Sequence, residues 1–230
     1  TSLINLLVNL FIGISVGTNV VVARSYGAHD DKGVQESVHT SILAAAVCGV
    51  VMIFVGVFLA RPMLEWMGTP EDVIDQSTLY MRIYFIGMPA MLLYNFGAAI
   101  LRAIGDTRRP LYFLIIAGVI NVIFNLIFVI IFGLGVAGVA IATVISQVIS
   151  ASLILLCLFH SEGCCRLTLS KLRIYPNRLR AILKIGIPAG LQGVIFNISN
   201  VLIQSSINSF GSSVMAGNTA AQNIEGFVYT

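Results

Sequence analysis

The fold is decided by residues 111–159, which read LYFLIIAGVINVIFNLIFVIIFGLGVAGVAIATVISQVISASLILLCLF. This stretch consists of two uncharged apolar runs joined by the short segment GLGVAG at 133–138. A helix needs about 20 residues to cross the hydrocarbon core of a membrane, and each run is about that long. The stretch therefore predicts a pair of membrane-spanning helices connected by a tight turn.

Both runs carry polar side chains inside an otherwise apolar sequence. Asn121 and Asn125 lie one helical turn apart in the first run, and Thr143, Gln147 and Ser150 share one helical face in the second. Amides at mid-membrane depth are costly unless they face a bundle interior or a cavity. These residues therefore indicate a functional interior between the helices.

The whole chain has the composition of an integral membrane protein. It is 57% hydrophobic and 10% charged, whereas a soluble domain is about 45–50% apolar and about 25% charged. The net charge of +3 is too small to indicate nucleic-acid binding. The four cysteines, at 48, 157, 164 and 165, have no CxxC spacing and no partnering histidines. Neither a metal site nor a disulfide framework is therefore expected.

Further apolar spans are predicted at 3–22, 40–60, 77–104 and 185–210, with a seventh beginning at Ser212. The expected fold class is an all-α integral membrane protein, a polytopic helical bundle. The chain begins without Met and ends in mid-pattern, so we expect a fragment of a longer protein.

Intramembrane amides recur outside the first pair of spans, at Asn9, Asn95, Asn197, Asn200 and Gln204. Helix–helix packing explains any single one of them. Together they favour a hydrated cavity with polar walls, suited to amphiphilic solutes or a weakly coordinated cation. Pro89 and Pro188 lie inside two of these spans and are expected bend points.

Connections with many Lys and Arg residues alternate along the chain with connections that have few, and this alternation predicts the orientation in the membrane. The connections at 24–39, 102–110 and 160–184 are the basic ones and are expected to be cytoplasmic, in a multi-pass protein of the cell (inner) membrane. The last is a long hydrophilic linker between two sets of spans, as in transporters built from two repeated bundles. Its later part, 176–184, has the pattern of an amphipathic interfacial helix.

No catalytic set is present in the sequence. His29, His39 and His160 lie in loops or at span edges without a neighbouring nucleophile, and no GxSxG, HExxH or phosphate-binding loop occurs. The protein is therefore not expected to be an enzyme, and no cofactor or metal is predicted.

Several motifs, in order, resemble the multidrug and toxic compound extrusion (MATE) transporters. They are FIGISVGTNV at 11–20, ARSYGA at 23–28, LRAIGDTRRP at 101–110, NVIFN at 121–125, GVAGVAIAT at 135–143 and LKIGIPAG at 183–190. The resemblance implies roughly helices two to eight of a twelve-helix, two-lobe fold. Residues 1–159 would be first-lobe helices without the first one, 160–184 the basic linker, and 185–230 the truncated start of the second lobe.

The resemblance also implies a coupling network in the first lobe. In the branch similar to DinF, Asn95, Asn121 and Thr143 match network positions, whereas Asn125 stands where many relatives have Asp. One titratable ligand is thereby lost, and the coupling ion, H⁺ or Na⁺, stays open. Span 185–210 lacks the acid typical of the NorM-like branch.

The leading hypothesis is a cation-coupled antiporter that exports amphiphilic, often cationic, compounds by alternating access, as a monomer when full length, in the lipid bilayer. Asn95, Asn121, Asn125 and Thr143 would couple the cation, and the substrate cavity would be lined by Asn9, Gln147, Asn197, Asn200 and Gln204. One alternative is a lipid-linked precursor flippase of the same superfamily, which would carry cationic side chains in its cavity. The other is a non-transporting membrane scaffold.

Overall fold

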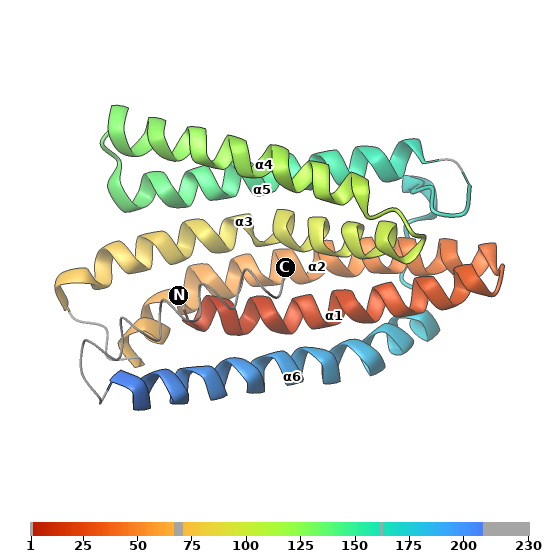
Figure 1. Cartoon of the computed structure of the whole chain (residues 1–230), viewed down its shortest axis with the longest axis horizontal. Coiled ribbons are helices and arrows are strands. Elements are labelled where there is room, and N and C mark those ends of the chain that lie inside the picture. The colour runs from red at the N-terminus through yellow and green to blue at the C-terminus, as the bar shows by residue number, and fades with distance from the viewer. Residues whose placement is uncertain (1, 67–70, 162, 209–230) are drawn as a thin grey trace.

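The computed structural model describes residues 2–66, 71–161 and 163–208, and these form a bundle of long helices (Figure 1). The long helices are α1 (Ser2–Gly27), α2 (Asp31–Trp66), α3 (Glu71–Ala103), α4 (Arg108–Leu126), α5 (Gly135–His160) and α6 (Pro176–Asn208). Each of these 6 helices contains a segment long and apolar enough to cross a membrane. The expected all-α, multi-pass membrane fold is therefore confirmed for the described part of the chain.

The hairpin of α4 and α5 lies along one side of the bundle and α6 along the opposite side, with α1, α2 and α3 between them (Figure 1). Helix α3 is the central element, because it packs extensively against α1, α2 and α5. Its Phe85, Met88, Leu92 and Phe96 are almost fully buried. Helix α4, by contrast, exposes most of its apolar side chains, as a helix that faces lipid does.

Most of the helices extend beyond the predicted spans. Helix α1 continues to Gly27, α2 runs from Asp31 to Trp66 where a span at 40–60 was predicted, and α3 begins at Glu71. Helix α6 begins at Pro176, so the expected amphipathic segment and the following span form one continuous helix. Proline suits this start because the N–H of the first helical residue has no acceptor within the helix, so the N–H that proline lacks costs no hydrogen bond. Helix α4 continues into a π-helix at Ile127–Ile131, which the apolar pattern did not indicate.

Helices α1 and α6 approach each other through glycines. A Cβ atom at Gly13 would overlap the backbone of Gly190, and one at Gly17 would overlap the carbonyl oxygen of Ile182. Gly186 in turn lies against the backbone of Ile14. This arrangement of small residues four apart on both helices lets the two backbones come into contact, as in small-xxx-small membrane interfaces.

Candidate functional site

A cavity of about 560 Å³ lies between α3, α4 and α5. Its polar lining residues are Tyr94, Asn95, Arg102, Asn121, Thr143, Ser146, Gln147 and Ser150. The structure thus brings together, in one cavity, residues from three separate spans that the sequence singled out. None of the described lining residues is acidic, and Arg102 is the charged one among them.

A chain of hydrogen bonds connects α4 to α5 at this cavity. Asn125 Nδ2 donates to Asn121 Oδ1 over 2.9 Å. Asn121 Nδ2 lies 3.3 Å from Ser146 Oγ and 3.5 Å from Thr143 Oγ1. The two hydroxyls donate onward to carbonyl oxygens of their own helix, Ser146 to Thr143 and Thr143 to Val139. The chain therefore runs in one direction, from the amide of Asn125 to the backbone of α5.

Two buried amide oxygens beside this chain have no hydrogen-bond partner within the described residues. They are Asn125 Oδ1 and Gln147 Oε1. A buried acceptor left unpaired costs about 1–3 kcal/mol. Such oxygens can accept a hydrogen bond from a hydroxyl, an ammonium group or a water molecule, or can coordinate a metal cation.

The other predicted site residues are placed differently. Asn95 lines the cavity, but its Nδ2 donates to the carbonyl oxygen of Met91 in its own helix, over 2.9 Å. Asn9 lies at the contact between α1 and α6, near Gly193. Pro89 of α3 packs against Gly49 of α2, and Pro188 is exposed on α6. The side chains of Asn197, Asn200 and Gln204 lie outside the described residues.

Three residues of the cavity were not predicted as site residues. Ser146 follows Thr143 by three positions, so the helical spacing could have identified it. The hydroxyl of Tyr94 donates to the carbonyl oxygen of Pro110 over 2.9 Å and so ties α3 to the start of α4. Arg102 stands in the last turn of α3, where sequence alone indicates only a membrane-surface charge.

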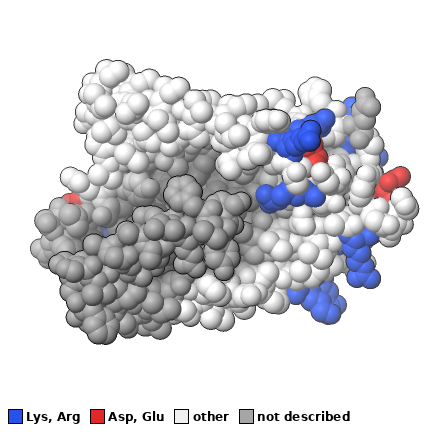
Figure 2. Space-filling model, viewed as in Figure 1, with Lys and Arg blue, Asp and Glu red and all other residues white. Residues whose placement is uncertain are grey.

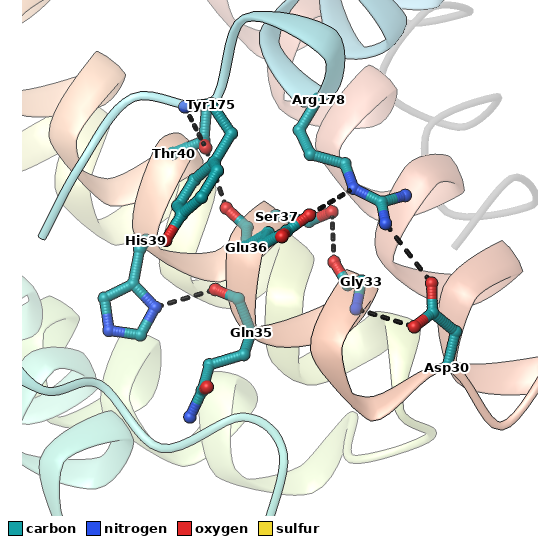
Figure 3. Close-up of polar contacts among 9 residues, drawn as sticks. All are labelled: Asp30, Gly33, Gln35, Glu36, Ser37, His39, Thr40, Tyr175 and Arg178. Atoms are coloured by element: carbon teal, nitrogen blue, oxygen red, sulfur yellow. Dashed lines mark hydrogen bonds and ion pairs between the residues drawn. The ribbon is translucent and has the colours of Figure 1, made fainter. Parts of the chain in front are cut away.

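A second polar cluster lies where α1 ends and α6 begins (Figure 3). Arg178, in the first turn of α6, forms two ion pairs of 3.2 Å, from Nη2 to Asp30 Oδ2 and from Nε to Glu36 Oε2. The Gly33 backbone N–H donates to Asp30 Oδ1 over 2.9 Å. That N–H and Arg178 hold the pKa of Asp30 below its usual range, against the opposing effect of desolvation.

Next to these ion pairs, the connection between α5 and α6 is bound to α2 (Figure 3). His39, buried in α2, has Nδ1 2.7 Å from the carbonyl oxygen of Gln35, and its Nε2 accepts the N–H of Thr168 over 3.1 Å. Thr40 Oγ1 accepts the N–H of Tyr175 over 3.1 Å.

The surface charge is distributed unevenly along the bundle. Figure 2 shows that most of the Lys and Arg visible in this view gather toward one end, where α1 ends and α6 begins. The basic connections at 24–39, 102–110 and 160–184 therefore share one end of the bundle. This arrangement agrees with the alternation of basic connections along the chain.

Comparisons with known proteins agree with this architecture. The MatE family model matches residues 1–127. The chain is 31% identical over 232 residues to the "Probable multidrug resistance protein YoeA" of Bacillus subtilis (strain 168), covering 97% of this chain and 50% of that protein. The chain thus spans about half the length of the curated relatives it matches.

Two of the similar solved structures show different states of a "multidrug resistance MATE family transporter of the MOP superfamily". The outward-facing conformation matches with a TM-score of 0.88 at 26% identity, over 96% of this chain and 50% of that one. The inward-facing conformation matches with a TM-score of 0.82 at 26% identity, over 97% of this chain and 51% of that one. The chain thus matches both conformations, and the TM-score with the outward-facing one is the higher of the two.

Proposed function

Because the chain belongs to the MATE family, we propose that it forms part of a cation-coupled antiporter that exports amphiphilic, often cationic, compounds by alternating access. The observation that carries the proposal is the hydrogen-bond chain from Asn125 through Asn121 to Ser146, beside a cavity of about 560 Å³. We assign residues 1–159 to the first lobe, 160–184 to the connection and 185–230 to the start of the second lobe.

The coupling role falls to Asn95, Asn121, Asn125 and Thr143. All four supply amide or hydroxyl oxygens, which are ligands for hard cations. Their network holds no titratable group, so protons would act on it through a carboxylate contributed by another part of the transporter, whereas Na⁺ could bind the oxygens directly. Protonation or Na⁺ binding beside the network would then change the shape of the cavity wall. The match of Asn95, Asn121 and Thr143 to the DinF-like pattern supports this assignment.

The basic end of the bundle supports an orientation in the membrane. We place the basic connections in the cytoplasm and the protein in the cell (inner) membrane. At this end α1 and α6 are in contact through Gly17 and Gly186, and Arg178 pairs with acids on the α1–α2 side. The closer agreement with the outward-facing relative supports a state that is closed toward the cytoplasm.

The proposal is tested with the full-length protein in lipid vesicles. Efflux of a fluorescent cationic dye is followed under an imposed proton gradient and then under a sodium gradient. Asn121→Ala should abolish efflux, whereas Val122→Ala, which alters the neighbouring lipid-facing side chain of α4, should leave it unchanged. The gradient that drives efflux identifies the ion. Folded protein that shows no efflux under either gradient would contradict the exporter.

One observation favours the flippase as a second candidate. Flippases of lipid-linked precursors are expected to carry cationic side chains in the cavity, and Arg102 lines the cavity at the end of α3. In this case the substrate would present a phosphate group, which a guanidinium binds through two parallel hydrogen bonds. Reconstituted protein would then move a fluorescent anionic phosphate-bearing lipid between leaflets, and Arg102→Gln would stop it without affecting export of the cationic dye.

A further inference from the structure

Two adjacent cysteines occupy a tight turn shortly after the end of α5. Cys164 and Cys165 are its central residues, and the N–H of Arg166 donates to the carbonyl oxygen of Gly163 over 3.4 Å. Gly163 has a φ of 94°, which glycine adopts without steric cost. The chain is anchored directly after the turn, because the N–H of Leu167 donates to the carbonyl oxygen of Leu158 in α5 over 3.0 Å. The fold therefore fixes the position of both cysteines.

Both cysteines line a cavity of about 640 Å³ at the end of the bundle where α1 ends and α4 begins. The cavity also has polar lining residues on four different helices, Tyr26, Asp31, Arg109 and His160. Cys164 is half-buried and Cys165 is 3% exposed. A small molecule in this cavity thus meets two neighbouring sulfur atoms that the proposed transport mechanism does not use.

The surroundings of the pair do not suit a metal cation. Burial raises the pKa of the Cys165 thiol to about 12, and the hydrogen-bonded thiol of Cys164 and the charge of Asp31 act in the same direction. Metal cations bind the thiolate, so the proton of Cys165 would have to be removed first. Asp31 and Arg109 carry opposite charges on the cavity wall. Among the described residues, no group of three or more His, Cys, Asp and Glu side chains is placed to hold a metal ion.

A disulfide between the two cysteines is also disfavoured. Adjacent Cα atoms lie about 3.8 Å apart across a trans peptide, whereas a relaxed disulfide joins Cα atoms about 4.4–6.8 Å apart. A bond between Cys164 and Cys165 would therefore be strained and easily reduced. A third atom inserted between the two sulfurs lengthens the ring and relieves this strain. The pair thus favours a ligand that bridges two protonated thiols through one atom.

We propose that Cys164 and Cys165 form a capture site for neutral trivalent arsenicals of the type R–As(OH)₂. Such a compound has two exchangeable hydroxyl groups, which matches two thiols without a third protein ligand. Each arsenic–oxygen bond is replaced by an arsenic–sulfur bond, and each thiol proton leaves with a hydroxide as water. Arsenic and sulfur keep their oxidation states, so no oxidant, reductant or base is consumed. The site does not depend on the proposed transport function.

The test uses phenylarsine oxide, which hydrates to phenyl–As(OH)₂, and the full-length protein in lipid nanodiscs. Any cysteine outside residues 1–230 is first replaced by serine. Bound arsenical is measured by intact-mass spectrometry while 2-mercaptoethanol is added as a competing monothiol, and peptide mapping locates the bridge. Because the second thiol acts intramolecularly, the 2-mercaptoethanol concentration that removes half of the arsenical should fall at least about a hundredfold in Cys164→Ser and in Cys165→Ser.

The matched control is Cys157→Ser. Cys157 packs against the same apolar cluster as the pair, but its Sγ lies 3.7 Å from Arg109 Nη1 and it is not among the residues that line this cavity. This variant should retain the arsenical as the parent does. Cys164→Ser changes a half-buried residue, so it carries the test even if serine at the buried position 165 prevents folding.

Four outcomes would overturn the proposal. The first is a parent protein that binds no arsenical, and the second is equal retention by the parent and Cys164→Ser. The third is equal retention by the folded parent and by the parent unfolded in guanidinium chloride, because the turn and the cavity would then contribute nothing. The fourth is protection of the pair by Cd²⁺ at the concentration of the arsenical, which would indicate a metal site instead.

Discussion

The hydrogen-bond chain at the cavity makes a quantitative prediction for double-mutant cycles. The bond from Asn125 to Asn121 has a normal length of 2.9 Å, whereas Asn121 lies 3.3 Å from Ser146 and 3.5 Å from Thr143. Interhelical and intramembrane side-chain hydrogen bonds contribute about 0.6 kcal/mol on average and at most about 1.7 kcal/mol. We therefore expect a coupling free energy of about 1 kcal/mol for Asn121 with Asn125 and below about 0.5 kcal/mol for Asn121 with Ser146.

The single substitution Asn121→Ala should lower the free energy of unfolding by about 2 kcal/mol, because it removes the contacts with Asn125, Ser146 and Thr143 and leaves the Asn125 amide buried and unpaired. The assay is reversible unfolding of the full-length protein in bicelles, with each single variant and each pair with Asn121→Ala. Val122→Ala, on the exposed side of α4, serves as the control and should change stability by less than about 0.5 kcal/mol. A coupling to Ser146 larger than the coupling to Asn125 would refute the ranking of the two bonds by their lengths.

Three further predictions concern Leu167 in the connection between α5 and α6, Gly190 at the contact between α1 and α6, and the carboxylate of Asp30. Leu167→Ala should destabilise the protein by about 2–5 kcal/mol in the same assay, whereas Leu169→Ala, at a residue 71% exposed, should have little effect. Gly190→Ala places a Cβ 2.7 Å from the carbonyl oxygen of Leu10 and should destabilise the protein by about 1–3 kcal/mol in the same assay, whereas Gly118→Ala, which meets no neighbour, should have little effect. Because the pKa of Asp30 is lowered in the folded state, its stabilising effect is present above the unfolded pKa of about 3.9 and is lost as the pH falls through the folded value. Asp30→Asn should therefore lower Tm at pH 7, and the difference from the parent should disappear in acid.

The sequence predicts the helices well because each span depends on local properties. A run such as 111–132 is apolar over the width of a membrane, and no tertiary contact is needed to recognise it. The helix ends are less well predicted, since helices continue beyond the hydrocarbon region. Helix α2 passes through Arg61 to Trp66, where the apolar pattern has already ended.

The connection at 160–184 shows what composition does not reveal. Its basic residues indicate a solvated linker, and they are indeed mostly exposed. The parts that hold it in place are a few uncharged groups between them, such as the side chains of Cys165 and Leu167 and the backbone N–H groups of Thr168 and Tyr175. The partners of the two N–H groups, His39 and Thr40, lie on α2, more than a hundred residues earlier, so no local pattern connects them.

The intramembrane asparagines show why the site itself needed the structure. Asn19 donates to the carbonyl oxygen of Ala99 over 2.9 Å and so links α1 to α3. Asn95 bonds within its own helix. Asn121 and Asn125 bond to side chains and leave an acceptor without a described partner. The four residues have the same chemistry in spans of similar polarity, yet Asn19 and Asn95 donate to backbone carbonyl oxygens, whereas Asn121 and Asn125 bond to other side chains. The number of buried amides is therefore weak support for a transport site, and what distinguishes the site is the acceptor oxygens that the described fold leaves unsatisfied.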